Sequence, residues 1–141
     1  MIEIKVKLLN KGASYPVKAH KTDAGFDLFS IDETSINRYE RKLIHTGISI
    51  QIPPGYYGQI FDRSGNALKR GLHIMGGVID SGYTGEVGVI LFNTEQPQRL
   101  RYMDKIAQIV ILPVPECAIV PVYDELDESD RGDGGFGSTD Q

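Results

Sequence analysis

Apolar and polar residues alternate in short runs along much of this chain. The first run covers residues 2–8, and a second covers residues 48–52 before a Pro-Pro-Gly sequence. Successive side chains of a β-strand point to opposite faces of a sheet, so this alternation predicts half-buried strands. We expect further strands over residues 56–61, 74–79, 86–93 and 106–114, and a short one over 119–122 that pairs at a sheet edge.

Turn-forming residues separate these runs, and only one helix is expected. Seven prolines and sixteen glycines interrupt the chain at short intervals, as an antiparallel sandwich or barrel requires. The helix is short, with Ser64 placed to cap its start and Gly71 to end it. After Tyr123 the chain becomes acidic and then glycine-rich, with little to pack. The pattern predicts one all-β domain over residues 1–123, followed by a linker and tail over residues 124–141.

Charge and composition exclude several classes of protein. The formal net charge is -4, whereas a general nucleic-acid binder should have a basic face. No apolar run approaches the roughly 18 residues that span a membrane, and the N-terminus lacks the layout of a signal peptide. We therefore expect neither a nucleic acid nor a membrane as a partner.

The few cysteine and histidine residues also narrow the chemistry. Cys117 is the single cysteine and cannot form an internal disulfide. We interpret it as a small packed residue in a protein of a reducing compartment, the cytoplasm. The three histidines are scattered along the chain, which argues against a zinc site.

The sequence around Asp80 is the first candidate for chemistry. Asp80 opens a Gly-containing turn between two apolar segments, which predicts a β-hairpin in which Val78 and Asp80 share one face and Ile79 points to the other. An aspartate in such a turn commonly bonds its own backbone. A structural Asp80 and a catalytic Asp80 are both compatible with this stretch alone.

The glycine-rich tail is the second candidate. It ends without the lysine and the following helix that a Walker phosphate loop needs. A disordered terminus is the default for such a composition. Glycines nevertheless let a backbone close around a ligand, Arg131 can bind a phosphate, and Phe136 can stack on a base. This tail is suited to folding over a ligand.

Five short motifs follow one another along nearly the whole chain. They are AGFDL at residues 24–28, RSG at 63–65, the Asp80 turn, DKIAQ at 104–108, and the tail segment 131–139, which contains GFGST. In this order they resemble the motifs of the homotrimeric dUTPase family. Each motif is weak evidence by itself, but five in order are highly specific.

The resemblance implies a fold, an assembly and a reaction. The expected fold is a single-domain, antiparallel, jelly-roll-like β-barrel with one short helix. It assembles as a homotrimer with shared active sites, over which a flexible C-terminal tail closes. The expected reaction is the hydrolysis of dUTP to dUMP and pyrophosphate by attack of water on the α-phosphorus. It is assisted by Mg²⁺, keeps uracil out of DNA and supplies dUMP for dTMP synthesis.

The resemblance also assigns roles to residues. Asp80 matches the general base, Tyr83 matches the residue that packs on the deoxyribose, and Asp27 matches the acid that holds Mg²⁺ through water. Backbone groups would read uracil at Gly77, Val78, Ile79 and Gly88. The phosphate contacts would come from Arg63, Ser64, Gly65 and Gln108, and the tail contacts from Arg131, Phe136, Gly137, Ser138 and Thr139.

Several of these residues also have plain structural interpretations. Asp27 could be an outward-pointing strand residue, and Ser64 could be only a helix cap. Gln108 could be a buried amide bonded to the backbone, and Phe136 could pack on a neighbouring subunit.

The chain also departs from the usual family pattern. Asp62 stands where a small residue or proline is frequent and could weaken phosphate binding by its charge, Asn66 stands where leucine is typical, and Gly82 could loosen the hairpin. None of these departures removes a catalytic group.

Three other functions are alternatives to dUTP hydrolysis. A dCTP deaminase of the same fold would need a glutamate where this chain has Ile90, and isoleucine cannot move a proton. A catalytically quiet or regulatory nucleotide-binding module would not need the complete set of candidate residues. A purely structural jelly-roll module would not need the tail.

Overall fold

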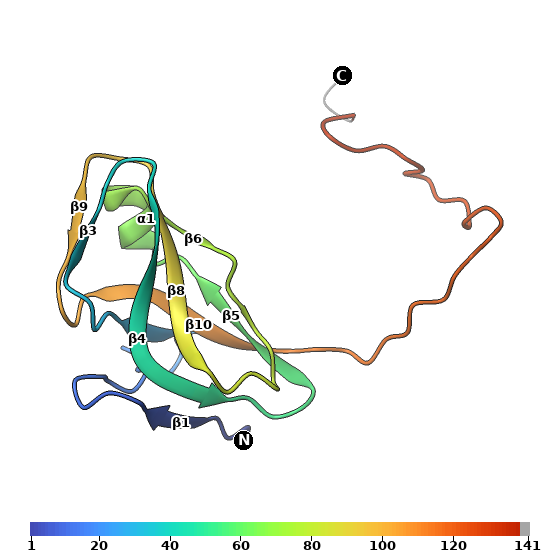
Figure 1. The fold of residues 1–141 in the computed structure, drawn as a ribbon. Coiled ribbons are helices and arrows are strands. Elements are labelled where there is room, and N and C mark those ends of the chain that lie inside the picture. Colours follow the sequence, from blue (N-terminus) through green and yellow to red (C-terminus); the bar gives the residue numbers. More distant parts are fainter. Residues whose placement is uncertain (139–141) are drawn as a thin grey trace.

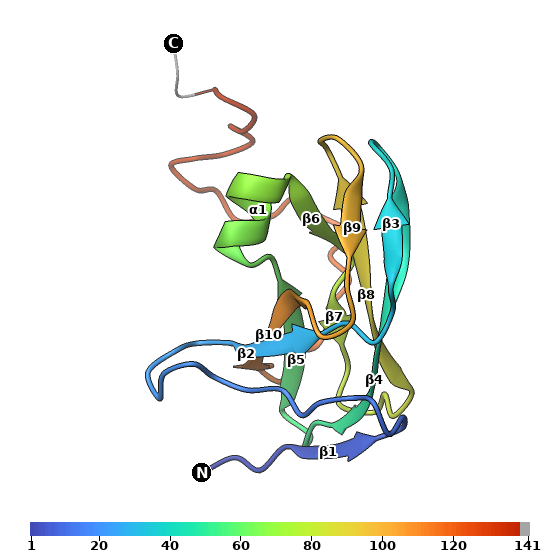
Figure 2. The same ribbon diagram turned by 90° about the vertical axis from the view of Figure 1, so that its left-hand side faces the viewer.

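The architecture consists of two four-stranded antiparallel sheets that share one core (Figures 1 and 2). The computed structural model describes residues 1–138. One sheet has the order β1-β4-β8-β6 and contains β1 (Lys5–Leu8), β4 (Arg41–Gln51), β8 (Glu86–Asn93) and β6 (Leu72–Met75). The other has the order β2-β10-β5-β7 and contains β2 (Phe26–Phe29), β10 (Lys105–Pro113), β5 (Tyr56–Phe61) and β7 (Val78–Ile79).

Two smaller elements complete the fold. A two-stranded sheet pairs β3 (Thr34–Ile36) with β9 (Gln98–Leu100), and the single helix α1 (Ser64–Arg70) connects β5 to β6. Within the described part of the chain, no helix is long and apolar enough to cross a membrane.

Alternating strand residues build the core between the two sheets. On β8, Val87, Val89 and Leu91 are buried, whereas Gly88 and Ile90 lie on the more exposed face. Ile60 and Ile109 enter the same cluster from the opposite sheet. Burying such side chains stabilises the fold by about 1.5–3 kcal/mol each, so the binary pattern of the sequence determines which face of each strand turns inward.

Most of the sequence-based strand predictions are confirmed. The strands predicted over residues 56–61 and 86–93 have the expected bounds, and the strand predicted over 106–114 is shifted by one residue. The strand predicted over 2–8 is shortened to β1, and the one predicted over 48–52 corresponds to the end of the longer β4. The strand expected over 74–79 is wrong as a single element, because β6 and β7 lie in different sheets. The strand over 119–122 is also wrong, because these residues form no strand in the single chain.

The helix prediction is confirmed at its end and wrong at its start. Gly71 closes α1 in the left-handed conformation at φ 61°, as expected. The N-cap, however, is Arg63, and no side chain caps the helix, so Ser64 is a first-turn residue rather than the cap. Cys117, expected to be packed, is exposed.

Residues 115–138 form no helix or strand and extend away from the sheets (Figure 1). Several large apolar side chains are exposed along this segment, namely Ile119, Val120, Tyr123, Leu126 and Phe136. This is the part of the chain in which apolar surface is least covered.

Candidate active site

A pair of glycines moves the chain from one sheet to the other just before Asp80. Gly76 has φ 71° and Gly77 has φ 111°, values that favour glycine. The Gly77 carbonyl accepts a 2.8 Å hydrogen bond from the Ile60 amide of β5. A Cβ on Gly77 would lie 2.9 Å from the Ile60 carbonyl oxygen, so a side chain cannot be accommodated there without displacement. Glycine at this position lets β7 add to β5.

The backbone of Asp80, rather than its side chain, closes the turn. The Tyr83 amide donates a 3.0 Å hydrogen bond to the Asp80 carbonyl oxygen. Ile79 is buried while Val78 and Asp80 are exposed, as the alternation predicts. Among residues 1–138, the Asp80 carboxylate makes no hydrogen bond or ion pair. The carboxylate is therefore available to a ligand or a water.

The Tyr83 side chain is held in place within the same loop. Its hydroxyl donates a 2.7 Å hydrogen bond to the Glu86 carbonyl oxygen. The ring lies against Gly85, where a Cβ would come within 2.6 Å of the hydroxyl oxygen and 2.7 Å of Cζ. Gly85 therefore provides the space that this ring orientation needs.

These residues border an open pocket of ≈ 420 Å³, called here the hairpin pocket. It brings five of the expected site residues together on one surface. Its full lining is Leu43, His45, Val78, Ile79, Asp80, Tyr83, Glu86, Gly88 and Ile90. The apolar walls and single unpaired carboxylate suit a planar base and a sugar. Gly77 is not part of the lining but precedes it directly.

Sequence reasoning missed Leu43 and His45 as members of this pocket. Both come from β4, whose His45 pairs with Gly88 of β8. A Cβ on Gly88 would lie 2.6 Å from Leu43 Cδ1, so the glycine makes room for the leucine. The strand expected over residues 48–52 did not extend to Leu43 and His45, and no other signal in the sequence points to these two residues.

A second open pocket of ≈ 350 Å³, the loop pocket, contains the residues expected to contact phosphate and Mg²⁺. Its lining is Ala19, Asp23, Ala24, Gly25, Asp27, Arg63, Ser64, Gly65 and Gln108. Strand register explains the grouping, because Gln108 of β10 pairs with Asp27 of β2 on one side and with Phe61 of β5 on the other. Arg63 follows two residues after Phe61. The loop and hairpin pockets share no lining residue.

Asp27 is the charge centre of the loop pocket. Its Oδ1 lies 2.9 Å from Arg63 Nε, and its Oδ2 lies 2.8 Å from Lys105 Nζ. The carboxylate is thus an ion-paired, mostly buried group rather than an outward-pointing strand residue. Within the described chain, no three His, Cys, Asp or Glu side chains are grouped to hold a metal ion.

This donor set still fits one kind of metal binding. Mg²⁺ commonly keeps several waters and binds through one or two carboxylates together with substrate phosphates. A single Asp27 carboxylate in an open pocket with Arg63 and Gln108 is compatible with that mode of binding, whereas residues 1–138 group no dedicated set of metal-binding side chains.

Gln108 has the backbone partner that its plain interpretation expects. Its Nε2 donates a 2.8 Å hydrogen bond to the Asp62 carbonyl oxygen. Its Oε1 is close to Gly25, where a Cβ would lie 2.5 Å away. Gln108 therefore anchors the β5–α1 connection while it also lines the loop pocket.

The tail does not reach either pocket in the single chain. Arg131 Nε donates a 2.8 Å hydrogen bond to the Gly134 carbonyl oxygen, and the Phe136 ring is fully exposed. Gly137 and Ser138 lie in the same exposed stretch, and Thr139 falls outside the described residues. No residue between 115 and 138 lines the hairpin or loop pocket.

Fold and site together define a small all-β protein with an unpaired carboxylate at a hairpin and an arginine-bearing pocket elsewhere on the chain. The dUTPase family model matches residues 11–140, and the chain belongs to that family.

Relatives of known name match the sequence of this chain over nearly its full length. The chain is 48% identical to the deoxyuridine 5'-triphosphate nucleotidohydrolase of Clostridium kluyveri, over 98% of each chain. It is 39% identical to that of Saccharomyces cerevisiae, over 96% of this chain and 93% of the relative.

Two phage enzymes illustrate the structural likeness. The dUTPase of Staphylococcus bacteriophage 80alpha with dUpNHpp has a TM-score of 0.89 and 33% identity, covering 96% of this chain and 97% of that one. A variant of the dUTPase from phage phi11 of S. aureus, with a coordinated structural Mg(II) ion, has a TM-score of 0.83 and 29% identity, covering 89% and 99%.

Proposed function

We propose that this protein hydrolyses dUTP to dUMP and pyrophosphate. Membership of the dUTPase family supports the reaction, and one structural observation connects the reaction with Asp80. The turn at Asp80 is closed by backbone groups alone, which leaves the carboxylate unengaged among the described residues at the edge of an apolar pocket. Such a group can accept a proton from a water beside a bound nucleotide.

Asp80 acts as the general base. It takes a proton from the water that attacks the α-phosphorus, while pyrophosphate leaves on the opposite side. The exposed position of the side chain keeps it within reach of that water. The turn bond from the Tyr83 amide orients the residue without using the carboxylate.

The hairpin pocket selects the base and the sugar. Backbone groups from Gly77 to Ile79 and at Gly88 contact the uracil edge, and this readout discriminates against the methyl group of thymine. Tyr83 packs on the deoxyribose, and its ring is fixed by the bond to Glu86 and by contact with Gly85. A ring held in this way excludes a 2′-hydroxyl without having to move when the substrate binds.

The loop pocket binds the phosphates. The Arg63 guanidinium uses Nε for Asp27, which leaves its terminal nitrogens as donors. Ser64 and Gly65 are exposed beside it, and space is open around Gly65. Gln108, which lines the same pocket, is the remaining phosphate contact of this proposal.

Asp27 holds Mg²⁺ through water in this proposal. The ion neutralises charge on the triphosphate when it is bound. Arg63 and Lys105 already orient the Asp27 carboxylate, and the phi11 relative is a dUTPase that coordinates Mg(II), there as a structural ion.

A homotrimer with shared sites is the proposed assembly. The hairpin pocket and the loop pocket share no residue, and the tail reaches neither within one chain. Each site would combine the Asp80 hairpin of one subunit with the tail of another, so that Arg131, Phe136, Gly137, Ser138 and Thr139 close over the nucleotide.

A single exposed cysteine, Cys117, fits a reducing compartment such as the cytoplasm.

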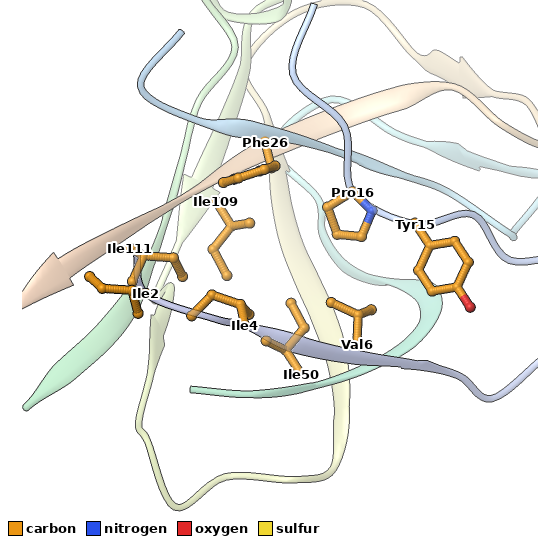
Figure 3. Close-up of a pocket in the computed structure, with 9 residues that line it drawn as sticks. All are labelled: Ile2, Ile4, Val6, Tyr15, Pro16, Phe26, Ile50, Ile109 and Ile111. Carbon is orange, nitrogen blue, oxygen red and sulfur yellow. The ribbon is translucent and has the colours of Figure 1, made fainter. Parts of the chain in front are cut away.

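Uncovered apolar surface supports the assembly. A groove of ≈ 380 Å³ beside edge strand β1 is lined almost entirely by apolar side chains (Figure 3), which are Ile2, Ile4, Val6, Tyr15, Pro16, Phe26, Ile50, Ile109 and Ile111. Residues 119–123 are apolar and exposed in the same chain. An edge strand and an unpaired apolar segment are each expected to find a partner, which a neighbouring subunit can supply.

A panel of nucleotides tests the proposed reaction. We expect pyrophosphate from dUTP, much less from UTP and dTTP, and no ammonia from dCTP. Ammonia release would instead indicate a deaminase, and tight binding of dUTP without product would indicate a catalytically quiet binding module.

Replacing the general base Asp80 should lower turnover strongly and keep substrate binding. Asp80→Asn has nearly the same shape but cannot take the proton of the water, so kcat should fall by about 10²–10⁴ with dUTP affinity largely kept. Asp124→Asn, an exposed carboxylate that lines neither pocket, is the matched control and should leave kcat unchanged. Near-normal turnover of Asp80→Asn would remove Asp80 from the mechanism.

Sugar selection should depend on Gly85 through Tyr83. In Gly85→Ala the added Cβ pushes against the Tyr83 ring, so turnover of UTP relative to dUTP should rise by about tenfold. Gly82→Ala is the control from the same loop, because nothing lies within 4 Å of a Cβ at that position. If the two variants kept the same UTP:dUTP ratio, Tyr83 would not be the residue that selects the sugar.

A further inference from the structure

Asp62, the residue before Arg63, is bonded to a strand of the other sheet. Its Oδ1 accepts a 2.6 Å hydrogen bond from the Ile74 amide of β6, and its Oδ2 lies 2.7 Å from His73 Nδ1. Asp62 follows β5, whereas β6 is an edge strand of the sheet that contains β8. The side chain therefore joins the two sheets where the chain enters the loop pocket.

The carboxylate of Asp62 is turned toward β6 and is not part of the loop-pocket surface. The lining of that pocket includes Arg63, Ser64 and Gln108 but not Asp62. Only 29% of the Asp62 side chain is exposed. Its negative charge is thus engaged by an amide and an imidazole, rather than presented to an anion in the pocket.

Two further bonds hold the connection between β5 and α1 against β10. The Asp62 carbonyl oxygen accepts a hydrogen bond from Gln108 Nε2. On the other side of the RSG segment, the buried Asn66 side chain donates through Nδ2 to the Lys105 carbonyl oxygen at 2.9 Å. Residues 63–65 are therefore fixed at both ends by side chains, while Ser64 and Gly65 themselves stay exposed.

We propose that Asp62 is a positioning residue for the phosphate-binding segment 63–65. The proposal rests on the proposed function, in which this segment contacts the triphosphate. The bond to Ile74 fixes the start of the segment, and His73 orients the carboxylate that makes this bond. Ordering the loop before the ligand arrives lowers the entropic cost of binding phosphate. This replaces the expectation that Asp62 weakens phosphate binding by its charge.

The role can be tested by comparing ligands with and without phosphates. We would measure the Kd of dUpNHpp by calorimetry and the inhibition constant of deoxyuridine by competition, for the wild type and for Asp62→Ala. Loss of a hydrogen bond to a charged group should raise the Kd of dUpNHpp by at least about tenfold. Deoxyuridine, which has no phosphate, should bind within about twofold of the wild type, because distant sites are nearly independent.

Two further variants, Asp62→Asn and Glu40→Ala, test whether the effect comes from the bond to the Ile74 amide or from the loss of any comparable hydrogen bond. Asp62→Asn keeps an oxygen for the Ile74 amide and should recover part of the dUpNHpp affinity. Glu40 also accepts a backbone amide, from Asn37 at 2.7 Å, but lines neither pocket, so Glu40→Ala tests the loss of a comparable bond elsewhere. It should leave the affinities for both ligands unchanged.

Each other outcome contradicts the proposal in a different way. Tighter dUpNHpp binding in both Asp62 variants would mean that the charge repels phosphate. A lower Tm with unchanged Kd would mean that Asp62 serves stability alone. If the wild type neither bound dUpNHpp nor hydrolysed dUTP, the proposed function itself would be wrong, and that result is separate from the behaviour of the variants.

Discussion

The close approach of Gly77 to β5 is the contact on which the candidate site depends. The Ile60 amide bonds to the Gly77 carbonyl, and the space beside Gly77 is too small for a Cβ. Because β6 pairs with β8 and β7 pairs with β5, this contact marks the point where the chain passes from one sheet to the other. The crossing ends at Asp80, whose exposed carboxylate borders the hairpin pocket. Backbone geometry at one glycine thus determines where the candidate base lies.

A single chain places the candidate general base and the candidate phosphate-binding residues on separate surfaces. The unengaged carboxylate lies on the hairpin pocket, and the arginine and its paired Asp27 lie on the loop pocket. The tail, which carries Arg131 and Phe136, lines neither pocket and extends away from the sheets (Figure 1). Exposed apolar surface remains beside β1 and over residues 119–123. These features have a common explanation if the functional unit contains several copies of the chain.

Sequence patterns predicted the parts of the fold that depend on alternation and missed those that depend on pairing. The long half-buried strands were recognisable because burial of one face imposes period two. The short strands β2, β3 and β9 span only three or four residues, too few to establish a period. The break at Gly76 and Gly77 was missed because apolar residues continue on both sides of it, although the two sides belong to different sheets.

The candidate site was predictable to a similar extent. Motif resemblance named Asp80 and Arg63, but it did not reveal that His45 borders the hairpin pocket or that Asp62 bonds to β6. Both depend on which residues lie opposite one another across strands that are distant in sequence. The structure also changes the interpretation of Ser64, which does not cap α1.

In the proposed trimer, a working site combines the hairpin of one subunit with the tail of another, and refolding of mixed subunits tests this arrangement. Asp80→Asn chains and chains truncated after Asp130 would be unfolded, mixed equally and refolded, with trimer formation checked by size. Random assortment places an intact hairpin beside an intact tail in roughly one site in four, half times half. About a quarter of wild-type activity should then return from two inactive parents. If mixed trimers form and stay inactive, hairpin and tail act within one chain and the proposed arrangement is wrong.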